Sequence, residues 1–329
     1  MGYDNKFMER CIQLARCGEY GAAPNPMVGA VIVHKGRILG EGYHCLCGGP
    51  HAEVNAIRSV KQKELLHEST LYVSLEPCAH YGKTPPCADL IIANQIPQVV
   101  VGTLDPFAKV NGLGVKKMRD AGIEVIVGVM EKECRALNER FFTFHRKKRP
   151  WILLKWAQSQ DGFIAQEDGT PVTFSTVETQ VLMHRLRAYN KAVMIGTRTA
   201  LIDNPSLTTR YWPGPNPVRV TVDRHDILPN NLKIKQEGAE TRIYSCGKLS
   251  DILADLYQRN IQSLMVEGGT QLLQSFIDEG LWDEIRIETS PMRLRKGIVA
   301  PAIAYAKNGE ETEIDGNGIR ILRPLNYEF

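Results

Sequence analysis

The chain has 329 residues, of which 43% are hydrophobic and 23% charged, and its formal net charge is +3 at pH 7. This length predicts two domains, at roughly 150 residues each, and the composition excludes the disordered and fibrous classes. The small net charge gives no reason to expect a nucleic acid as the main partner, and because no apolar run reaches the ~20 residues that span a bilayer, we expect no membrane partner.

The first half of the chain alternates predicted helices with predicted strands. An amphipathic helix over residues 5–17 leads through a proline turn to VGAVIV and KGRILGEGYH, which we expect to form the two arms of a hairpin. A helix from about His51 to Lys61 follows, and Pro50 suits its first turn. The remaining elements, in chain order, are the strand STLYVSLEPC, the helix CADLIIANQ, the strand QVVVGTLDP, the helix GVKKMRDAG and the strand IEVIVGVM. This alternation predicts a sheet with helices on both faces.

A basic stretch, FFTFHRKKRP at residues 141–150, separates this half from the next. The cluster His145–Arg149 has the charge of a nucleic-acid patch, but consecutive charges that end at a proline are more often a solvated linker, which we favour. We therefore expect the boundary near residue 147, with domains at 1–147 and 148–329. The second half repeats the alternation, with a helix over 176–189, the strands AVMIG, PVRVTVD and TRIYS, and the strand SLMVEGG leading into the helix TQLLQSFIDEG.

Eight cysteines are spread along the chain without the close spacing of a small disulfide-bonded scaffold. The N-terminal segment also lacks the apolar core of a signal peptide. We therefore expect a cytoplasmic protein whose thiols are free or bound to metal.

One histidine and two of these cysteines form a candidate zinc site. His51, Cys78 and Cys87 are a suitable ligand set for zinc, and three protein ligands leave the fourth position to water, as catalytic sites require. His51 and Cys87 are each expected to begin a helix, where the dipole and free N–H groups stabilise a thiolate. Glu53 would face the bound water and act as the catalytic proton shuttle. This layout matches that of zinc deaminases, which attack an amidine-like ring carbon and release ammonia.

Two alternatives remain open for these residues. The zinc could be structural, because such sites have four protein ligands and Cys45, Cys47 or His80 is close enough in sequence to supply the fourth. The two cysteines could instead be buried packing residues. The spacing also departs from the usual deaminase signature, Pro-Cys-x-x-Cys, because eight residues separate the cysteines here.

Several longer motifs resemble those of a known family. NPMVGAVIV, GEGYH, PHAEVNAI, LEPCAHYGKTPPCADLII and VVVGTLDP resemble the deaminase half of the bifunctional riboflavin-biosynthesis deaminase–reductases, and LKWAQSQDG, HRLRA, DNPSLTTR and VEGGTQLLQSF resemble their reductase half. The resemblance implies an α/β protein with a cytidine-deaminase-like three-layer α/β/α domain and a dihydrofolate-reductase-like α/β domain. It implies one zinc ion per deaminase site, NADPH, phosphorylated pyrimidine substrates and a homo-oligomer. The implied reactions are the hydrolytic deamination of 2,5-diamino-6-ribosylamino-4(3H)-pyrimidinone 5′-phosphate and the reduction of its ribosyl group to ribityl.

The resemblance also implies roles for individual residues. Contacts to the first substrate fall to Asn25, His44 and Lys83. Cofactor positions of the reductase are Ala157, Thr173, Thr199, Asp203, Gly269 and Thr270, and its substrate positions are Arg187, Leu207, Arg210 and Glu267.

Elementary chemistry supports some of these roles. Gly268 to Thr270 lie where a strand meets a helix N-terminus, whose N–H groups can bind phosphate, although a tight turn without a ligand has the same pattern. Arg187 and Arg210 carry planar guanidinium groups that suit a phosphate, and Arg187 could otherwise belong to a solvated helix face.

The reductase half departs from the family pattern in three places. The family usually has Ser-Leu-Asp-Gly-Arg where this chain has SQDGF at 159–163, it has a tryptophan where this chain has Thr173, and it has an aspartate directly before Ala192. Without that tryptophan, the preference for NADPH over NADH is an expectation only. Lys155 lies in an apolar strand, so we expect it to point into the reductase cleft, unless it extends to the surface.

Two other classes of function are weighed against this one. The first is a deaminase of another base, such as cytidine or an RNA adenosine, with an unrelated second domain. It would need a groove for single-stranded RNA that is rich in aromatic and basic side chains. The second is a non-catalytic scaffold with structural zinc. Glu53 argues against it, because a structural zinc site needs no proton shuttle.

Overall fold

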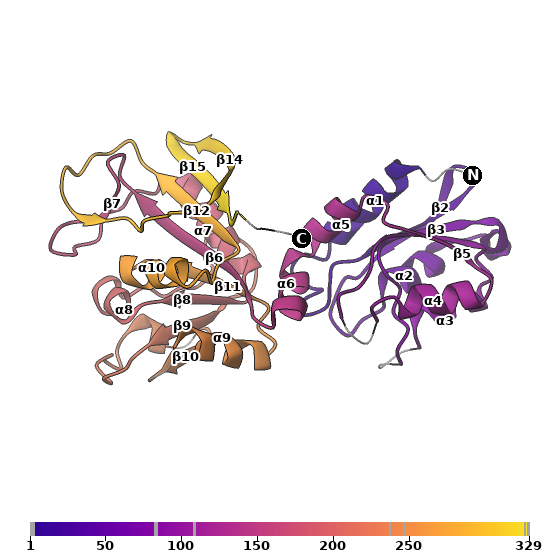
Figure 1. Ribbon diagram of the computed structural model, residues 1–329, viewed down its shortest axis with the longest axis horizontal. Helices are drawn as coiled ribbons and strands as arrows, with labels where there is room; N and C mark the ends of the chain where they lie inside the picture. Colours follow the sequence, from indigo (N-terminus) through magenta and orange to yellow (C-terminus); the bar gives the residue numbers. More distant parts are fainter. Residues whose placement is uncertain are drawn as a thin grey trace. The chain divides into compact units, whose positions relative to one another are not determined.

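The computed structural model describes residues 4–81, 85–107, 110–236, 238–245, 248–325 and 327. The chain divides between Lys147 and Lys148 into two compact units. Each unit contains a β-sheet with helices on both faces (Figure 1). Within the described ranges, the structure has no helix that combines the length and the apolar character needed to cross a membrane.

The first unit is built on a five-stranded sheet with the strand order β2-β1-β3-β4-β5. β1 pairs antiparallel with β2 and with β3, whereas β3, β4 and β5 are parallel. The strands are β1 Gly29–His34, β2 Arg37–Tyr43, β3 Thr70–Leu75, β4 Gln98–Thr103 and β5 Glu124–Val127. The hairpin predicted from VGAVIV and KGRILGEGYH is therefore confirmed.

Helices cover both faces of this sheet because its strands are apolar on both sides. α1 (Asn5–Arg16) and α5 (Glu131–Leu137) pack on one face, where Met8 and Cys134 meet Val31 and Val100. α2 (Ala52–Ser59), α3 (Cys87–Ala93) and α4 (Leu113–Asp120) pack on the other, where the buried side chains are those of Ala56, Ile91, Met118, Ile32, Val73 and Val101. Successive strand residues point to opposite faces, and the result is three layers.

The segment predicted as a solvated linker is largely helical. α6 spans Glu139–Lys147 and buries Phe141, Phe142 and Phe144, so the prediction is wrong for the first part of the cluster His145–Arg149. Basic residues in the last turn of a helix interact favourably with its dipole, which explains why the charges continue the helix instead of ending it. The connection to the next strand shortens to 148–150.

The second unit is built on an eight-stranded sheet with the order β10-β9-β8-β11-β6-β12-β15-β14. The six strands from β10 to β12 are parallel, and β15 is antiparallel to β12 and β14. The strands are β6 Trp151–Gln158, β8 Ala192–Ile195, β9 Val218–Val222, β10 Thr241–Tyr244, β11 Ser263–Glu267, β12 Glu284–Thr289, β14 Lys307–Ile314 and β15 Asn317–Arg323. A separate small sheet pairs β7 (Phe163–Ala165) with β13 (Ile298–Val299).

Four helices flank the larger sheet. α9 (Leu249–Gln258) and α10 (Thr270–Asp278) bury Leu256 and Phe276 on one face, and α7 (Val177–Tyr189) and α8 (Thr197–Asp203) bury Leu186 and Ala200 on the other. The carboxyl ends of the parallel strands meet at one edge of the sheet, where open α/β sheets bind their ligands.

Candidate metal centre and reductase cleft

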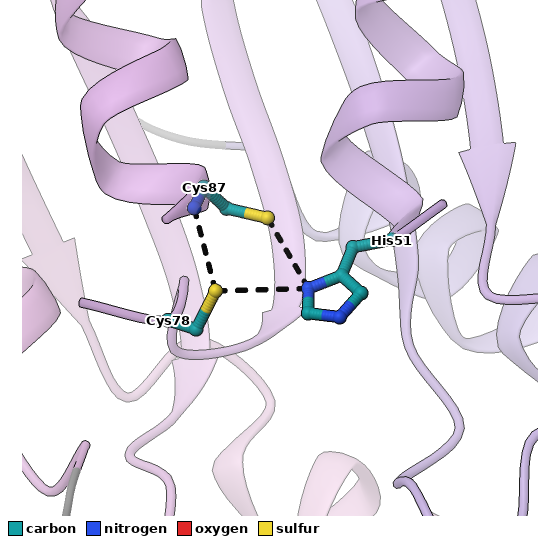
Figure 2. A group of neighbouring side chains, drawn as sticks. All are labelled: His51, Cys78 and Cys87. Atoms are coloured by element: carbon teal, nitrogen blue, oxygen red, sulfur yellow. Dashed lines mark hydrogen bonds between the residues drawn. The ribbon is translucent and has the colours of Figure 1, made fainter. Parts of the chain in front are cut away.

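The structure brings the three predicted zinc ligands together in the first unit. His51 is the N-cap residue of α2, Cys87 is the first residue of α3, and Cys78 lies in the loop after β3. The His51 Nδ1 atom is 3.6 Å from the Cys78 sulfur and 3.3 Å from the Cys87 sulfur (Figure 2). All three ligand atoms lie within 4.8 Å of one another, and one tetrahedral zinc ion can contact all of them.

The surroundings of Cys78 favour the thiolate form that binds metal. The Cys87 backbone N–H donates to the Cys78 sulfur over 3.3 Å. Hydrogen bonds from Cys87, and then from His51, lower the pKa of the Cys78 thiol to about 4. The same hydrogen bond raises the pKa of the Cys87 thiol, which donates it. Because zinc binds thiolate and not thiol, Cys78 fits the ion directly, and Cys87 would release its proton on binding.

Among the described residues, no fourth protein ligand joins this group. Cys45, Cys47 and His80 are exposed, and the cluster of possible ligands consists of His51, Cys78 and Cys87. An open fourth position is the arrangement of catalytic zinc, whereas structural zinc is closed by four protein ligands. The geometry therefore favours a catalytic site.

Glu53 lies in the first turn of α2 and is only 3% exposed. Burial raises the pKa of its carboxyl to about 7, and the carboxyl interacts with the Cys87 thiol. A carboxyl with a pKa near neutrality can both accept and release a proton at working pH. Its place beside the ligands is the one expected of a proton shuttle.

Two residues predicted to contact the first substrate lie next to His51. The Asn25 side-chain amide donates to His44 Nε2 over 3.1 Å, and His44 Nδ1–H donates to the Pro50 carbonyl over 3.0 Å. The His44 ring lies edge-on to the His51 ring, with centroids 5.3 Å apart. Burial lowers the pKa of His44, which favours the neutral ring that these two hydrogen bonds require. The third residue, Lys83, lies outside the described residues.

A buried glutamate two residues before Cys78 was not predicted to matter. The Glu76 carboxylate accepts hydrogen bonds from four backbone N–H groups, at 2.8–3.2 Å. The four donors are those of Asp105, Gly112, Gly114 and Val115. Glu76 thus joins the start of α4 and the loop after β4 to the segment that carries Cys78. The available signal was a charged residue directly after an apolar strand, which needs a partner if it is buried.

The second unit contains a cleft of about 1140 Å³ at the carboxyl ends of its parallel strands. Most residues predicted to bind cofactor line this cleft, together with Glu267 from the predicted substrate set. They are Ala157, Thr199, Asp203, Gly269 and Thr270. Thr173 is exposed and does not line the cleft, although its neighbours Val172 and Phe174 do.

The turn between β11 and α10 is shaped by two glycines. Gly268 and Gly269 both have φ near +72°, a conformation that favours glycine. A Cβ atom on Gly269 would lie 3.0 Å from the Thr199 hydroxyl oxygen, so the missing side chain also lets the two segments approach closely. The turn leads directly into α10, whose free N–H groups can receive a phosphate.

A second cavity of about 630 Å³ is lined by Arg187, Leu207 and Arg210, and Asp203 lines both cavities. Arg187 is buried and its guanidinium binds Glu267 with two hydrogen bonds of 2.6 and 2.7 Å. The alternative of a solvated helix face is therefore wrong for Arg187. Because this fork already holds a carboxylate, Arg210 is the better candidate for a phosphate.

Lys155 lines the larger cleft, as expected. Its ammonium is 3.2 Å from a carboxylate oxygen of Glu288, and its side chain is 11% exposed, so it does not extend to the surface. Glu288 also accepts hydrogen bonds from Ser175 and Asn317, both of 2.8 Å. On β11, Glu267 is the register partner of Lys155, which places a second carboxylate beside the same ammonium.

Asp161, from the SQDGF departure, holds a loop and does not line the cleft. Its carboxylate accepts from the backbone N–H groups of Leu294 and Arg295, at 3.1 and 2.8 Å, and from the Ser159 hydroxyl at 2.7 Å. The hydrogen bond from Ser159, followed by those from the backbone, lowers the pKa of Asp161 to about 2. This carboxylate therefore serves the local fold.

Comparisons with known proteins cover almost the whole chain. A family model described as the cytidine and deoxycytidylate deaminase zinc-binding region matches residues 1–103, and one described as the RibD C-terminal domain matches residues 150–296. The riboflavin biosynthesis protein RibD of Aquifex aeolicus (strain VF5) is 40% identical over 318 residues, covering 90% of this chain and 89% of its own length.

Two solved structures are similar over their full length. A diaminohydroxyphosphoribosylaminopyrimidine deaminase/5-amino-6-(5-phosphoribosylamino)uracil reductase from Thermotoga maritima is 38% identical, with a TM-score of 0.88 and coverage of 97% of this chain and 98% of that one. Acinetobacter baumannii RibD is 31% identical, with a TM-score of 0.89 and coverage of 98% and 99%.

These matches confirm the family resemblance and the two expected fold classes, cytidine-deaminase-like and dihydrofolate-reductase-like. They exclude a deaminase with an unrelated second domain and a non-catalytic scaffold, because both halves match enzymes of one kind. The cofactors of such an enzyme are zinc and NADPH, and the donor set and the cleft described above fit them. The chain belongs to the family of bifunctional riboflavin-biosynthesis proteins that join a zinc-dependent pyrimidine deaminase to a reductase.

Proposed function

We propose that the chain hydrolytically deaminates 2,5-diamino-6-ribosylamino-4(3H)-pyrimidinone 5′-phosphate and then reduces the ribosyl side chain with NADPH, giving 5-amino-6-(5-phosphoribitylamino)uracil. The observation that carries the proposal is the three-ligand group with its open fourth position beside buried Glu53. The reductase cleft in the same chain supplies the second half of the sequence of reactions.

In the deaminase site, His51, Cys78 and Cys87 would hold the zinc. When bound, zinc lowers the pKa of water so that hydroxide is available at neutral pH. Glu53 accepts the proton that this ionisation releases and delivers it to the amino group that leaves as ammonia. Its pKa of about 7 suits both directions of transfer.

His44 and Asn25 position the pyrimidine for this reaction. The neutral His44 ring is fixed by its hydrogen bonds to the Pro50 carbonyl and the Asn25 amide, so it offers a rigid aromatic edge beside His51. A pyrimidine held against this edge has its reacting carbon in place before the attack, so no further entropy is lost at that step.

In the reductase site, the turn at Gly268–Thr270 receives the cofactor pyrophosphate at the N-terminus of α10. NADPH supplies the hydride. Ala157, Thr199 and Asp203 line the same cleft. Asp203 also lines the second cavity, so the two cavities adjoin.

Arg210 binds the substrate phosphate from the second cavity. Its guanidinium already contacts the hydroxyl groups of Ser206 and Thr208, which hold it in place while other N–H donors stay free for a phosphate. Lys155 lies on the cleft floor, where its ammonium contacts the opened ribose or the nicotinamide amide.

The test is to assay the two reactions separately on the purified full-length chain. Ammonia should be released from the diaminopyrimidine phosphate in a zinc-dependent manner, and NADPH should be oxidised only when the deaminated phosphoribosyl compound is supplied. Ammonia release from free cytidine or adenosine, but not from the pyrimidine phosphate, would contradict the substrate assignment.

The proposal also includes a cytoplasmic location, expected from the dispersed cysteines, and a homo-oligomer. Light scattering coupled to size-exclusion chromatography tests the oligomer. A monomeric mass at working concentration would contradict it.

A further inference from the structure

The reductase cleft carries cationic side chains to which the proposed function gives no role. The strands β11, β8, β9 and β10 are parallel neighbours in this order, and nucleotides bind such sheets outside the carboxyl ends of the strands. The glycine turn at 268–269 follows β11. Arg198 follows β8, Arg224 follows β9, and Lys248 precedes α9 after β10, and all three line the cleft.

Arg198 and Arg224 start from backbone positions that the structure ties together. The Thr197 hydroxyl donates a hydrogen bond of 2.5 Å to the Val222 carbonyl, so the start of α8 is held against the end of β9. Arg198 comes one residue after Thr197, and Arg224 comes two residues after Val222. Neither of them has an ion-pair partner among the described residues, which leaves both available to an anion.

The carboxylate at this strand end is already engaged. In sites for NAD, an acidic residue near a strand end accepts hydrogen bonds from the ribose diol, whereas sites for NADP place an arginine there for the 2′-phosphate. Asp223 directly follows β9, but its two oxygens accept the backbone N–H groups of Ile227 and Leu228, both at 3.0 Å. It lines the cleft but is buried, and because both oxygens already accept loop N–H groups it is a poor acceptor for a ribose diol.

An apolar wall completes this part of the cleft. Val222 of β9, Leu249 and Ile252 of α9 and Leu272 of α10 all line it. Apolar side chains with a few placed polar groups are the usual lining of a small-ligand site, and the flat faces of an adenine ring can pack against them.

We propose that Arg198 and Arg224 bind the 2′-phosphate of NADPH and thereby select it over NADH. The inference rests on the proposed reductase function. A cofactor with its pyrophosphate at the N-terminus of α10 would have its nicotinamide on the β6 side, where Ala157 and Lys155 line the cleft, and its adenosine on the side of β8 and β9, where the two arginines line it. A guanidinium binds a phosphate through charge-assisted hydrogen bonds, which the 2′-hydroxyl of NADH cannot replace.

The substrate phosphate has a different place in this arrangement. It is assigned to Arg210 in the second cavity, whose lining includes neither Arg198 nor Arg224. Substitutions of the two arginines should therefore change cofactor selection and leave the Michaelis constant for the pyrimidine substrate unchanged.

The kinetic test compares NADPH with NADH in reduction of the deaminated substrate by the full-length chain. The wild type should prefer NADPH. Arg198→Ala and Arg224→Ala should each lower kcat/KM for NADPH by about 10- to 100-fold, the value of one hydrogen bond to a charged group, with kcat/KM for NADH unchanged. Arg320→Ala, an exposed arginine on β15, is the matched control and should change neither value.

A binding test is independent of catalysis. By calorimetry, the wild type should bind adenosine 2′,5′-bisphosphate more tightly than adenosine 5′-monophosphate, and each arginine substitution should weaken the first ligand and leave the second unchanged. Equal affinity for the two ligands in the wild type, or an equal loss for both in the variants, would overturn the assignment. If the chain reduces the substrate with neither cofactor, the proposed function fails, but the binding test still decides whether the two arginines recognise the phosphate.

Discussion

Glu53 is the residue at which catalysis in the deaminase site can be separated from metal binding. It is buried beside the three ligands without belonging to them. Glu53→Gln keeps the shape of the side chain and removes the proton shuttle, so we expect the variant to retain about one zinc ion per chain while deamination falls by at least ~10²-fold, a common general acid–base contribution. Zinc content by elemental analysis and ammonia release are the two measurements.

The two measurements on Glu53→Gln distinguish the roles of this residue. Full deaminase activity would contradict the shuttle mechanism. Loss of zinc together with activity would mean that Glu53 holds the metal or its ligands.

Lys155 is the residue at which catalysis in the reductase cleft can be tested. Its ammonium is 3.2 Å from the Glu288 carboxylate, its register partner on β11 is Glu267, and both Lys155 and Glu267 line the cleft. Lys155→Ala should abolish most NADPH-dependent reduction, and because it leaves a buried carboxylate unpaired it should also destabilise the second unit by about 3 kcal/mol. The ammonia-release rate of the same sample is the control, and wild-type reduction by the variant would show that Lys155 has no role in the reaction.

At this scale, the sequence alone predicted the metal site better than the reductase contacts. His51, Cys78 and Cys87 were identified because their side-chain chemistry is specific and their neighbours recur as a motif. The pairing of Arg187 with Glu267 joins residues 80 apart in sequence, so no local pattern could show that the guanidinium is already engaged. The family resemblance places Thr173 at a cofactor position, yet the residue is exposed and does not line the cleft.

At the scale of elements, α4 is held in place by a side chain from a neighbouring strand end. Glu76 accepts four backbone N–H groups at or before the first turn of α4, and Cys78 follows two residues later. Glu76→Gln replaces an acceptor oxygen with an amide donor that faces N–H groups. We expect a loss of about 3 kcal/mol in the free energy of unfolding, since buried unsatisfied donors cost ~1–3 kcal/mol each, and faster loss of zinc to a chelator.

The control for Glu76→Gln is Glu64→Gln. Glu64 is exposed in the short 3-10 helix Lys63–Glu68, so this substitution makes the same chemical change without burial. Chemical denaturation of both full-length variants, followed with zinc release, gives the comparison. Equal stabilities would show that Glu76 does not hold α4.

The sequence predicted most elements whose apolar pattern is strong. Most strands of the two sheets up to β11 follow apolar runs, many of them rich in β-branched residues, and the strands that the sequence predicted lie within a few residues of their expected positions. α6 was missed because its basic end resembles a linker, although the aromatic side chains of Phe141, Phe142 and Phe144 are buried in the first unit. β14 carries the polar sequence KNGEETEI and forms at the edge of the sheet through its pairing with β15, so its strand conformation depends on context more than on propensity.

At the scale of the whole molecule, the two activities should be separable. Each unit has its own sheet and its own buried clusters, and the two chemistries share no group. Removing zinc from the full-length chain with a chelator should abolish deamination and leave NADPH oxidation intact when the deaminated compound is supplied. If chelation stops both reactions while circular dichroism is unchanged, the two units are coupled and this two-module account is wrong.

The reciprocal experiment uses Arg210→Ala. Loss of a charge-assisted contact to the substrate phosphate should raise the Michaelis constant for reduction by about 10-fold or more, while deamination proceeds at the wild-type rate. A parallel loss of deamination would contradict the assignment of Arg210 to the reductase alone.

The division into domains at 1–147 and 148–329 as independent catalytic modules stays a prediction until these experiments are done. Sequence motifs could identify both halves because each half contains family motifs along its length. These motifs include the zinc ligands in the first half and the glycine turn at 268–269 in the second. They could not show which cations face the cofactor. Arg198 and Arg224 follow strands that are neighbours only in the folded sheet, where β8 pairs with β9.

The most direct test of the central claim is a mass analysis of the products formed by the purified full-length chain from the diaminopyrimidine phosphate and zinc, with and without NADPH. Without NADPH, the product should be the deaminated compound, in which an oxygen replaces an NH group and the ribosyl chain is unchanged. With NADPH, that compound should be replaced by one carrying two more hydrogens, 5-amino-6-(5-phosphoribitylamino)uracil. A reduced product that still contains the 2-amino group, or no reduction after complete deamination, would contradict the account.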